Sequence, residues 1–214
     1  THLKYYINEG QNFNDVTPIR ATTNNGITFS ATNGSSTITA TDSSHGAVLG
    51  DFVTISGAVS LGGNITAAVL NQEYQITSVP SVNTYTFTAK DTSGNTATAN
   101  ASDSGNGGSG VDGAYQINVG LDTYVQSTGW GGDSWSAGTW GATAALSDTN
   151  QLRLWSHDHF GEDLLMAVRN GAIYYHDTSD GLTVRAEALT AQTGANLVPT
   201  KCLGITVSET DRHI

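Results

Sequence analysis

Two histidines and three carboxylates lie close together in the phrase HDHFGED, where metal-ion or acid-base chemistry is most plausible on residue type. Imidazole and carboxylate groups are common ligands of divalent metal ions. In an extended backbone His157 and His159 share one face, so they could bind an ion together with Glu162. The spacing matches no structural zinc pattern, however, and the same residues could form a solvated turn between Trp155 and Leu164. The sequence leaves both interpretations open, and it favours the structural one.

A hydrolase would need two carboxylates on either side of a cleft, and Asp158 with Glu162 or Asp163 is an available pair. Acidic residues number nineteen among 214, so such a pair is weak evidence. No nucleophile elbow, phosphate-binding loop or dinucleotide fingerprint occurs, because none of the glycine-rich phrases follows a strand and opens a helix. We therefore expect no catalytic residue, no cofactor and no enzyme.

Three tryptophans, Trp130, Trp135 and Trp140, lie five residues apart in a glycine-rich phrase. This spacing fits neither the helical period nor the alternation of a strand, which indicates a loop. Flat aromatic rings stack on sugars, and tryptophan is also enriched at the centres of protein interfaces. The loop is therefore a candidate carbohydrate-binding or interface site, and we favour the interface.

Charge and cysteine content exclude several classes of protein. Eight basic and nineteen acidic residues give a formal charge of -11, and the basic residues are scattered, so we expect no specific nucleic-acid binding. Cys202 is the one cysteine, so no intrachain disulfide can form, and we expect it to be a small buried apolar residue. No apolar run reaches transmembrane length, so we expect no membrane insertion.

Alternating threonine-rich phrases predict an antiparallel all-β protein. Between residues 21 and 110 six runs are separated by turn residues, a pattern typical of a small sandwich or barrel. The runs are GITFSAT, STITATD, DFVTISG, NITAAVL, EYQITSV and TYTFTAK. The glycine- and serine-rich stretch at 98–110 is expected to be a flexible connection or an exposed loop. We interpret 21–110 as an inserted β domain, and 1–20 with 111–214 as a β body.

The body is predicted to contain two hairpins. The first has a strand through Tyr5 and Ile7, a turn at residues 8–10 and a second strand that closes at 16–19. The second joins apolar runs at 164–168 and 172–175.

The turn of the second hairpin is Asn170-Gly171, a strong hairpin signal because both residues tolerate positive φ. Another strand is expected at 114–119. The two hairpins share the order of their elements, which favours a repeated β unit, as in a propeller-like or meander body.

Six longer phrases of the chain carry a family resemblance. They are GWGGDSWSAGTWG, LRLWSHDHFGEDLLMAVRNGAIYYHD, VSETDRHI, YYINEGQNFNDVTPIR, LGDFVTISGAV and LNQEYQITSVPSVNTYTFTA. Together they resemble virion tail proteins of marine tailed bacteriophages. The chain departs from that pattern at Ala172 and His176, where Gly and Trp are expected, and neither change disturbs the predicted hairpin. Because such proteins continue well beyond Ile214, we expect the chain to be an N-terminal portion.

The resemblance implies a structural protein similar to the nozzle or tail-tubular proteins, in which a β-propeller-like body and appended β domains form a ring. It implies location in the virion, self-association and binding to other tail proteins. An acidic ring would let DNA pass without adhering to it. The alternative is a host-recognition module that binds a host-surface glycan through the tryptophan loop. An enzyme that acts on cell-surface polysaccharide through Asp158 and Glu162 is the least favoured hypothesis.

Overall fold

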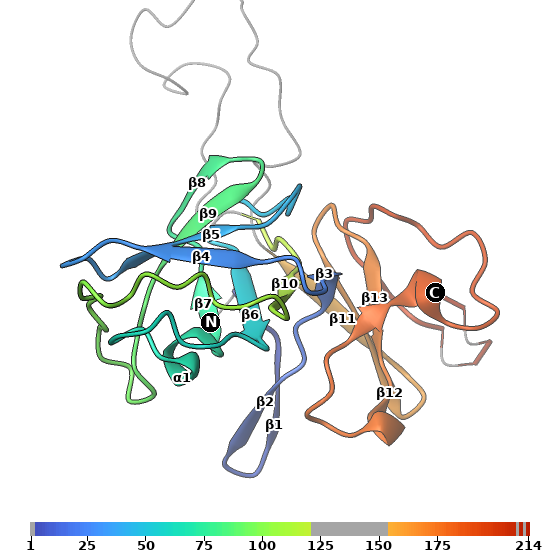
Figure 1. Ribbon diagram of the computed structural model, residues 1–214. Coiled ribbons are helices and arrows are strands. Elements are labelled where there is room, and N and C mark those ends of the chain that lie inside the picture. Colours follow the sequence, from blue (N-terminus) through green and yellow to red (C-terminus); the bar gives the residue numbers. More distant parts are fainter. Residues whose placement is uncertain (1–2, 121–153, 209, 212) are drawn as a thin grey trace, which may run out of the picture. The chain divides into compact units, whose positions relative to one another are not determined.

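The protein is nearly all β, as predicted (Figure 1). The computed structural model describes residues 3–120, 154–208, 210–211 and 213–214. Every strand pairing in it is antiparallel. The chain divides into two compact units: unit 1 contains residues 1–18 and 119–214, and unit 2 contains residues 19–118.

Unit 2 is a sandwich of two four-stranded sheets. The first sheet has the order β3 (Ile19–Thr23), β10 (Asp112–Gln116), β6 (Phe52–Ser56), β7 (Glu73–Gln75). The second has the order β4 (Thr28–Ala31), β5 (Thr37–Thr41), β9 (Thr84–Thr88), β8 (Ser78–Ser81). The first and last strands of the unit, β3 and β10, pair with each other, so its two ends lie side by side.

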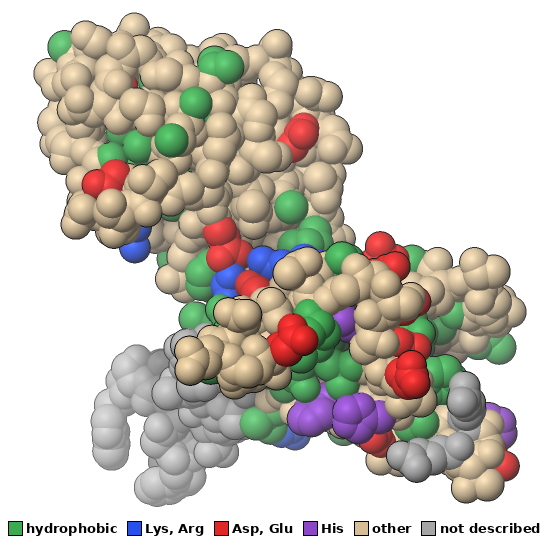
Figure 2. Space-filling view, turned by 90° about the horizontal axis from the view of Figure 1, so that it is seen from below, with side chains coloured by type: hydrophobic (Ala, Val, Ile, Leu, Met, Phe, Trp, Pro, Cys, Tyr) green, Lys and Arg blue, Asp and Glu red, His purple; other side chains and the backbone are tan. Residues whose placement is uncertain are grey.

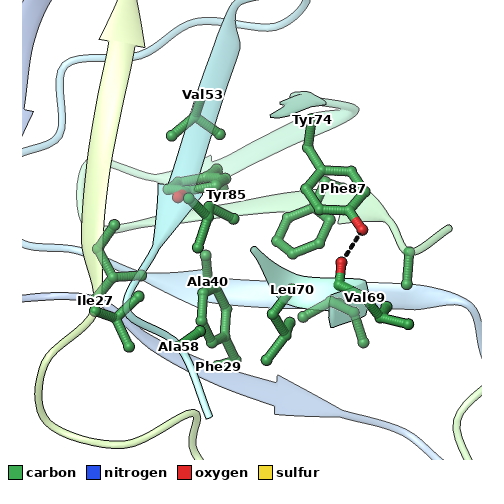
Figure 3. Close-up of a cluster of buried hydrophobic side chains, with 14 of the residues drawn as sticks. Ile27, Phe29, Ala40, Val53, Ala58, Val69, Leu70, Tyr74, Tyr85 and Phe87 are labelled. Carbon is green, nitrogen blue, oxygen red and sulfur yellow. Dashed lines mark hydrogen bonds between the residues drawn. The ribbon is translucent and has the colours of Figure 1, made fainter. Parts of the chain in front are cut away.

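The core of unit 2 lies between the two sheets, because the strands alternate in the way the sequence predicts. In β9, Tyr85 and Phe87 are fully buried, while the three threonines that alternate with them are partly exposed. Tyr74 stacks on Phe87 with ring centroids 4.3 Å apart, and its hydroxyl donates to the Val69 carbonyl (Figure 3). Val53 of the first sheet joins this cluster.

Two of the six predicted runs differ from the structure. NITAAVL contains the short helix α1 (Ala67–Leu70) instead of a strand. The hydroxyl of Thr66 accepts the Val69 N–H and caps this turn, while Leu70 is buried. EYQITSV spans parts of two strands, β7 and β8, which belong to different sheets. The other four runs each contain one strand.

The stretch at 98–110 is built into unit 2. Asp103 is 5% exposed, and its carboxylate accepts the backbone N–H groups of Gly63, Asn64, Ile65 and Asn100 at 2.7 to 3.1 Å. Burial raises the pKa of this carboxyl, but the four donors outweigh burial and hold the pKa below its usual value. The prediction of a flexible connection was wrong, because one buried carboxylate fixes two polar loops together.

Unit 1 begins with a two-stranded sheet formed by β1 (Tyr6–Glu9) and β2 (Asn12–Asp15). The predicted hairpin is confirmed, but its turn lies at Gly10 and Gln11, and its second strand ends at Asp15, before the predicted close at 16–19. Gly10 has a φ of 66°, which suits a tight two-residue turn. The Val16 side chain is fully buried and packs in the core.

The rest of unit 1 is a meander in the order β11 (Trp155–Phe160), β12 (Asp163–Val168), β13 (Ile173–His176), β14 (Glu187–Ala188). Short 3₁₀ turns, η2 and η3, occupy Thr178–Asp180 and Leu189–Ala191. The hairpin predicted at Asn170-Gly171 is confirmed as β12–β13, and Asn170 has a φ of 61°.

The central strand of the meander, β12, is buried on both of its faces. Leu164 and Met166 belong to a core cluster against which Tyr5 and Ile7 pack. Cys202 is half-buried, and its backbone bridges to Gly171. In the part of the chain that the structure describes, no helix has the length and apolar character needed to cross a bilayer.

Candidate functional site

The first two strands of the meander position the histidine and carboxylate cluster. β11 and β12 pair from Trp155 with Val168 to Phe160 with Asp163, which leaves Gly161 and Glu162 as the turn. His157 and His159 therefore lie on a strand, and the predicted charged turn is confined to two residues.

The two histidines share one face of β11, as an extended backbone requires. Both side chains are exposed, and Figure 2 shows exposed histidines next to one another on the face that it presents. The ring of His157 meets the edge of Tyr5 at 5.7 Å, and Tyr5 also contacts Trp155 at 5.2 Å. This face of β11 therefore packs on the N-terminal segment.

The proposed metal ligands do not form a closed donor set. His157 and His159 project from the strand, whereas Glu162 is exposed in the turn beyond its end. Within the described residues, no group of three or more His, Cys, Asp or Glu side chains is arranged to hold a metal ion. Metal binding at these three residues stays a prediction.

Asp158 lies on the opposite face of β11 from the histidines. Its carboxylate accepts the backbone N–H of Val207 at 2.8 Å and that of His159 at 2.9 Å. These two bonds, the one from Val207 first, hold the pKa of the carboxyl below its usual value. The side chain of neighbouring Ser156 also bonds to Ile205, so this face of the strand anchors the segment that follows Cys202.

The Asp163 carboxylate also accepts hydrogen bonds from other segments of unit 1. It accepts the Tyr175 hydroxyl at 2.5 Å and both the N–H and the hydroxyl of Thr178, at 3.0 and 3.1 Å. The bond from Tyr175 is the main cause that lowers the pKa of Asp163, and the same bond raises the pKa of Tyr175 to about 12. The carboxylate thus fixes the start of η2 against β13.

His176 does not join the exposed histidines. It is 1% exposed, and neither of its ring nitrogens has a hydrogen-bond partner. Leu164 pairs with His159 of β11 and with His176 of β13. His159 and His176 are therefore separated by two strand spacings, about 10 Å.

A second polar cluster was not predicted. The Asp15 carboxylate binds the Lys4 ammonium at 2.8 Å, the Arg185 guanidinium at 2.9 Å and the backbone N–H and hydroxyl of Thr17. Burial raises the pKa of Asp15, and these partners outweigh it and lower the pKa below its usual value. The residues are too far apart in the sequence for any local pattern to connect Arg185 with the other three.

The candidate carbohydrate or interface residues Trp130, Trp135 and Trp140 lie outside the described residues. Their role therefore stays a prediction.

No protein-family model and no curated protein sequence matches this chain. Among solved structures, the Phage phi92 endosialidase matches with a TM-score of 0.32 and 15% sequence identity. The match covers 76% of this chain, which spans 23% of that protein. A structural similarity this low supports no conclusion about the fold or the activity of this chain.

Proposed function

We propose that this chain is a non-enzymatic structural protein of a phage tail, resident in the virion, which works by self-association and by binding other tail proteins. The phrases that resemble phage tail proteins support the tail assignment, and the antiparallel all-β fold is compatible with it.

The observation that carries the structural role is that two of the three carboxylates in the cluster, Asp158 and Asp163, accept hydrogen bonds from other segments of unit 1. A general acid and base would need carboxyl groups facing a shared cleft with room for substrate. Asp158 instead anchors the segment at Val207, and Asp163 anchors Tyr175 and Thr178. An aspartate is ionised at neutral pH, and the lowered pKa of each of these two groups moves it further from the raised pKa that a proton donor needs.

The charge of the chain also agrees with this proposal. A formal charge of -11 repels the phosphate backbone, so DNA moving past such a protein would not adhere to it.

Light scattering during size exclusion tests self-association. The chain has a mass of 22.3 kDa, and we expect species at multiples of that mass, with the larger ones more abundant as concentration rises. A strictly monomeric chain at the highest soluble concentration would contradict the proposed function.

A glycan-binding module is the second candidate function, favoured by the five-residue spacing of the three tryptophans among glycines. If it is correct, the chain binds members of a glycan array, and Trp135→Ala weakens that binding by about tenfold or more, because stacking on the ring is lost. Trp155→Ala is an unsuitable control, since Trp155 packs against the core. Val82→Ala, at an exposed position in unit 2, is the control and should leave binding unchanged. Absence of binding to every glycan would exclude this candidate.

A further inference from the structure

The β1–β2 hairpin forms a separate two-stranded sheet. Among the described residues, no further strand pairs with either edge. Figure 1 shows it as a narrow ribbon that ends in a free tip. A two-stranded sheet is marginally stable by itself and gains most from additional strands or from packing on one face. Ile7 packs on the core from the inner face of the hairpin, and no strand of the described residues covers its edges.

The register of the hairpin identifies the backbone groups on those edges. Glu9 and Asn12 flank the two-residue turn, and such a pair is hydrogen-bonded within the hairpin. The N–H of Val16 also donates to the Tyr5 carbonyl, which fixes the alternation at the other end. Tyr6 and Asn8 therefore belong to the pairs that are not hydrogen-bonded within the hairpin. Their backbone N–H and C=O groups point outward along the β1 edge.

The outer face of the hairpin carries exposed aromatic side chains. Tyr6 and Asn8 lie directly opposite Asp15 and Phe13, so these four residues share the face that points away from Ile7. Phe13 is 69% exposed and Tyr6 is 39% exposed. Exposed apolar rings on an ordered strand are typical of a contact surface.

An open groove of about 580 Å³ lies beside these rings. Four of its five lining residues come from the segment at 4–8, and the fifth is Phe13. Tyr6, Asn8 and Phe13 lie on the outer face of the hairpin, so the groove lies on that face, next to the β1 strand.

The charge near this groove is balanced. Two cations, Lys4 and Arg185, bind the Asp15 carboxylate, and the exposed Glu9 at the end of β1 supplies a second negative charge. The chain as a whole carries -11, so two copies repel each other, and a contact between them requires a surface on which negative charge is cancelled. The hairpin combines that balance with exposed rings and an open edge.

We propose that the β1 edge, with Tyr6 on it, forms a contact between two copies of this chain, with β1 of one copy pairing antiparallel to β1 of the other. This inference rests on the proposed self-association and assigns a surface to it. Antiparallel pairing of identical strands has two-fold symmetry, so a single surface is complementary to itself. The contact joins two two-stranded sheets into a four-stranded sheet, in which Tyr6 lies on the strand that makes the contact.

Sedimentation velocity of the full chain over a range of concentrations tests this contact. We expect Tyr6→Glu to raise the dissociation constant of the pair by about tenfold or more, because it places like charges from both copies in the contact. Asn8→Pro should have a similar effect, since it removes an outward N–H without breaking a bond inside the hairpin. Val82→Glu is the matched control, because Val82 is 73% exposed and lies in unit 2. It should leave association unchanged.

The outcomes separate this contact from the proposed function. Circular dichroism should show that each variant keeps the fold, as expected for changes at exposed positions. If the natural chain associates and both hairpin variants associate equally well, the contact is overturned and self-association stands. If the natural chain is monomeric at every concentration, both are overturned.

Discussion

Replacing Asp103 by alanine is expected to lower the free energy of unfolding of unit 2 by about 4 kcal/mol, because four backbone N–H groups lose their acceptor. Those donors belong to two loops, at residues 63–65 and at Asn100, that no β-ladder joins. Ile65, one of the donors, is fully buried, so water cannot replace the carboxylate there without entering the core. Urea denaturation followed by circular dichroism measures the loss.

Asp91 provides a matched control for this substitution. Its carboxylate also accepts backbone N–H groups, from Ser93 and Asn95, but in an exposed loop where water can take its place. Asp91→Ala should therefore change stability little. An equal loss in the two variants would show that the burial of Asp103 is not what makes its bonds important.

The same carboxylate predicts a dependence on pH. The pKa of Asp103 is lower in the folded chain than in the unfolded chain, so its contribution to stability is complete above the unfolded pKa, about 4. That contribution disappears as the pH falls through the folded pKa. The difference in unfolding free energy between the natural chain and Asp103→Ala should thus shrink below about pH 4. A difference that stays constant from pH 7 to pH 3 would contradict this explanation.

Residues 19–118, expressed alone, are expected to fold into the same sandwich as in the full chain. The buried cluster that runs from Ile27 to Tyr115 lies entirely within this segment. Its ends also require no outside support, because Ile19 of β3 pairs with Gln116 of β10. Circular dichroism should show a β spectrum and a single cooperative thermal transition.

A shorter piece, residues 19–110, is the control for this experiment. It lacks β10, which lies between β3 and β6 in the first sheet, so it should not fold cooperatively. If residues 19–118 show no transition while the full chain does, unit 2 is not an independent folding unit.

Local signals in the sequence predicted the features of the fold that depend on neighbouring residues. Asn170-Gly171 identified the β12–β13 turn, because few residue pairs accept its backbone conformation. The alternation of threonine with Ile38, Ala40, Tyr85 and Phe87 identified β5 and β9 and their buried faces. The change in composition near residue 21 lies close to the start of unit 2 at 19, whereas unit 2 extends to 118 and contains β10, which the boundary at 110 assigned to the body.

Features that depend on distant residues were not predicted. Asp158 finds its partner Val207 49 residues along the chain, and Asp103 finds Gly63 40 residues away. The composition around each aspartate indicates a polar turn. It cannot show that the carboxylate accepts a hydrogen bond from a backbone N–H group far away in the sequence. The helix at Ala67–Leu70 was missed for a related reason, since burial of Leu70 and the Thr66 cap outweigh the alternation of the phrase.

The pairing of β3 with β10 also affects the rest of the chain through entropy. If the roughly 100 residues between Pro18 and Val119 were disordered, unit 1 could fold only by closing a long flexible loop. The entropic cost of loop closure grows with the logarithm of loop length, so this loop costs about 3 kcal/mol more to close than a turn of a few residues. Folding of unit 2 removes most of that penalty, because it fixes the ends of the insertion at neighbouring positions on one sheet. Melting of the sandwich would therefore weaken unit 1 without breaking any bond inside it.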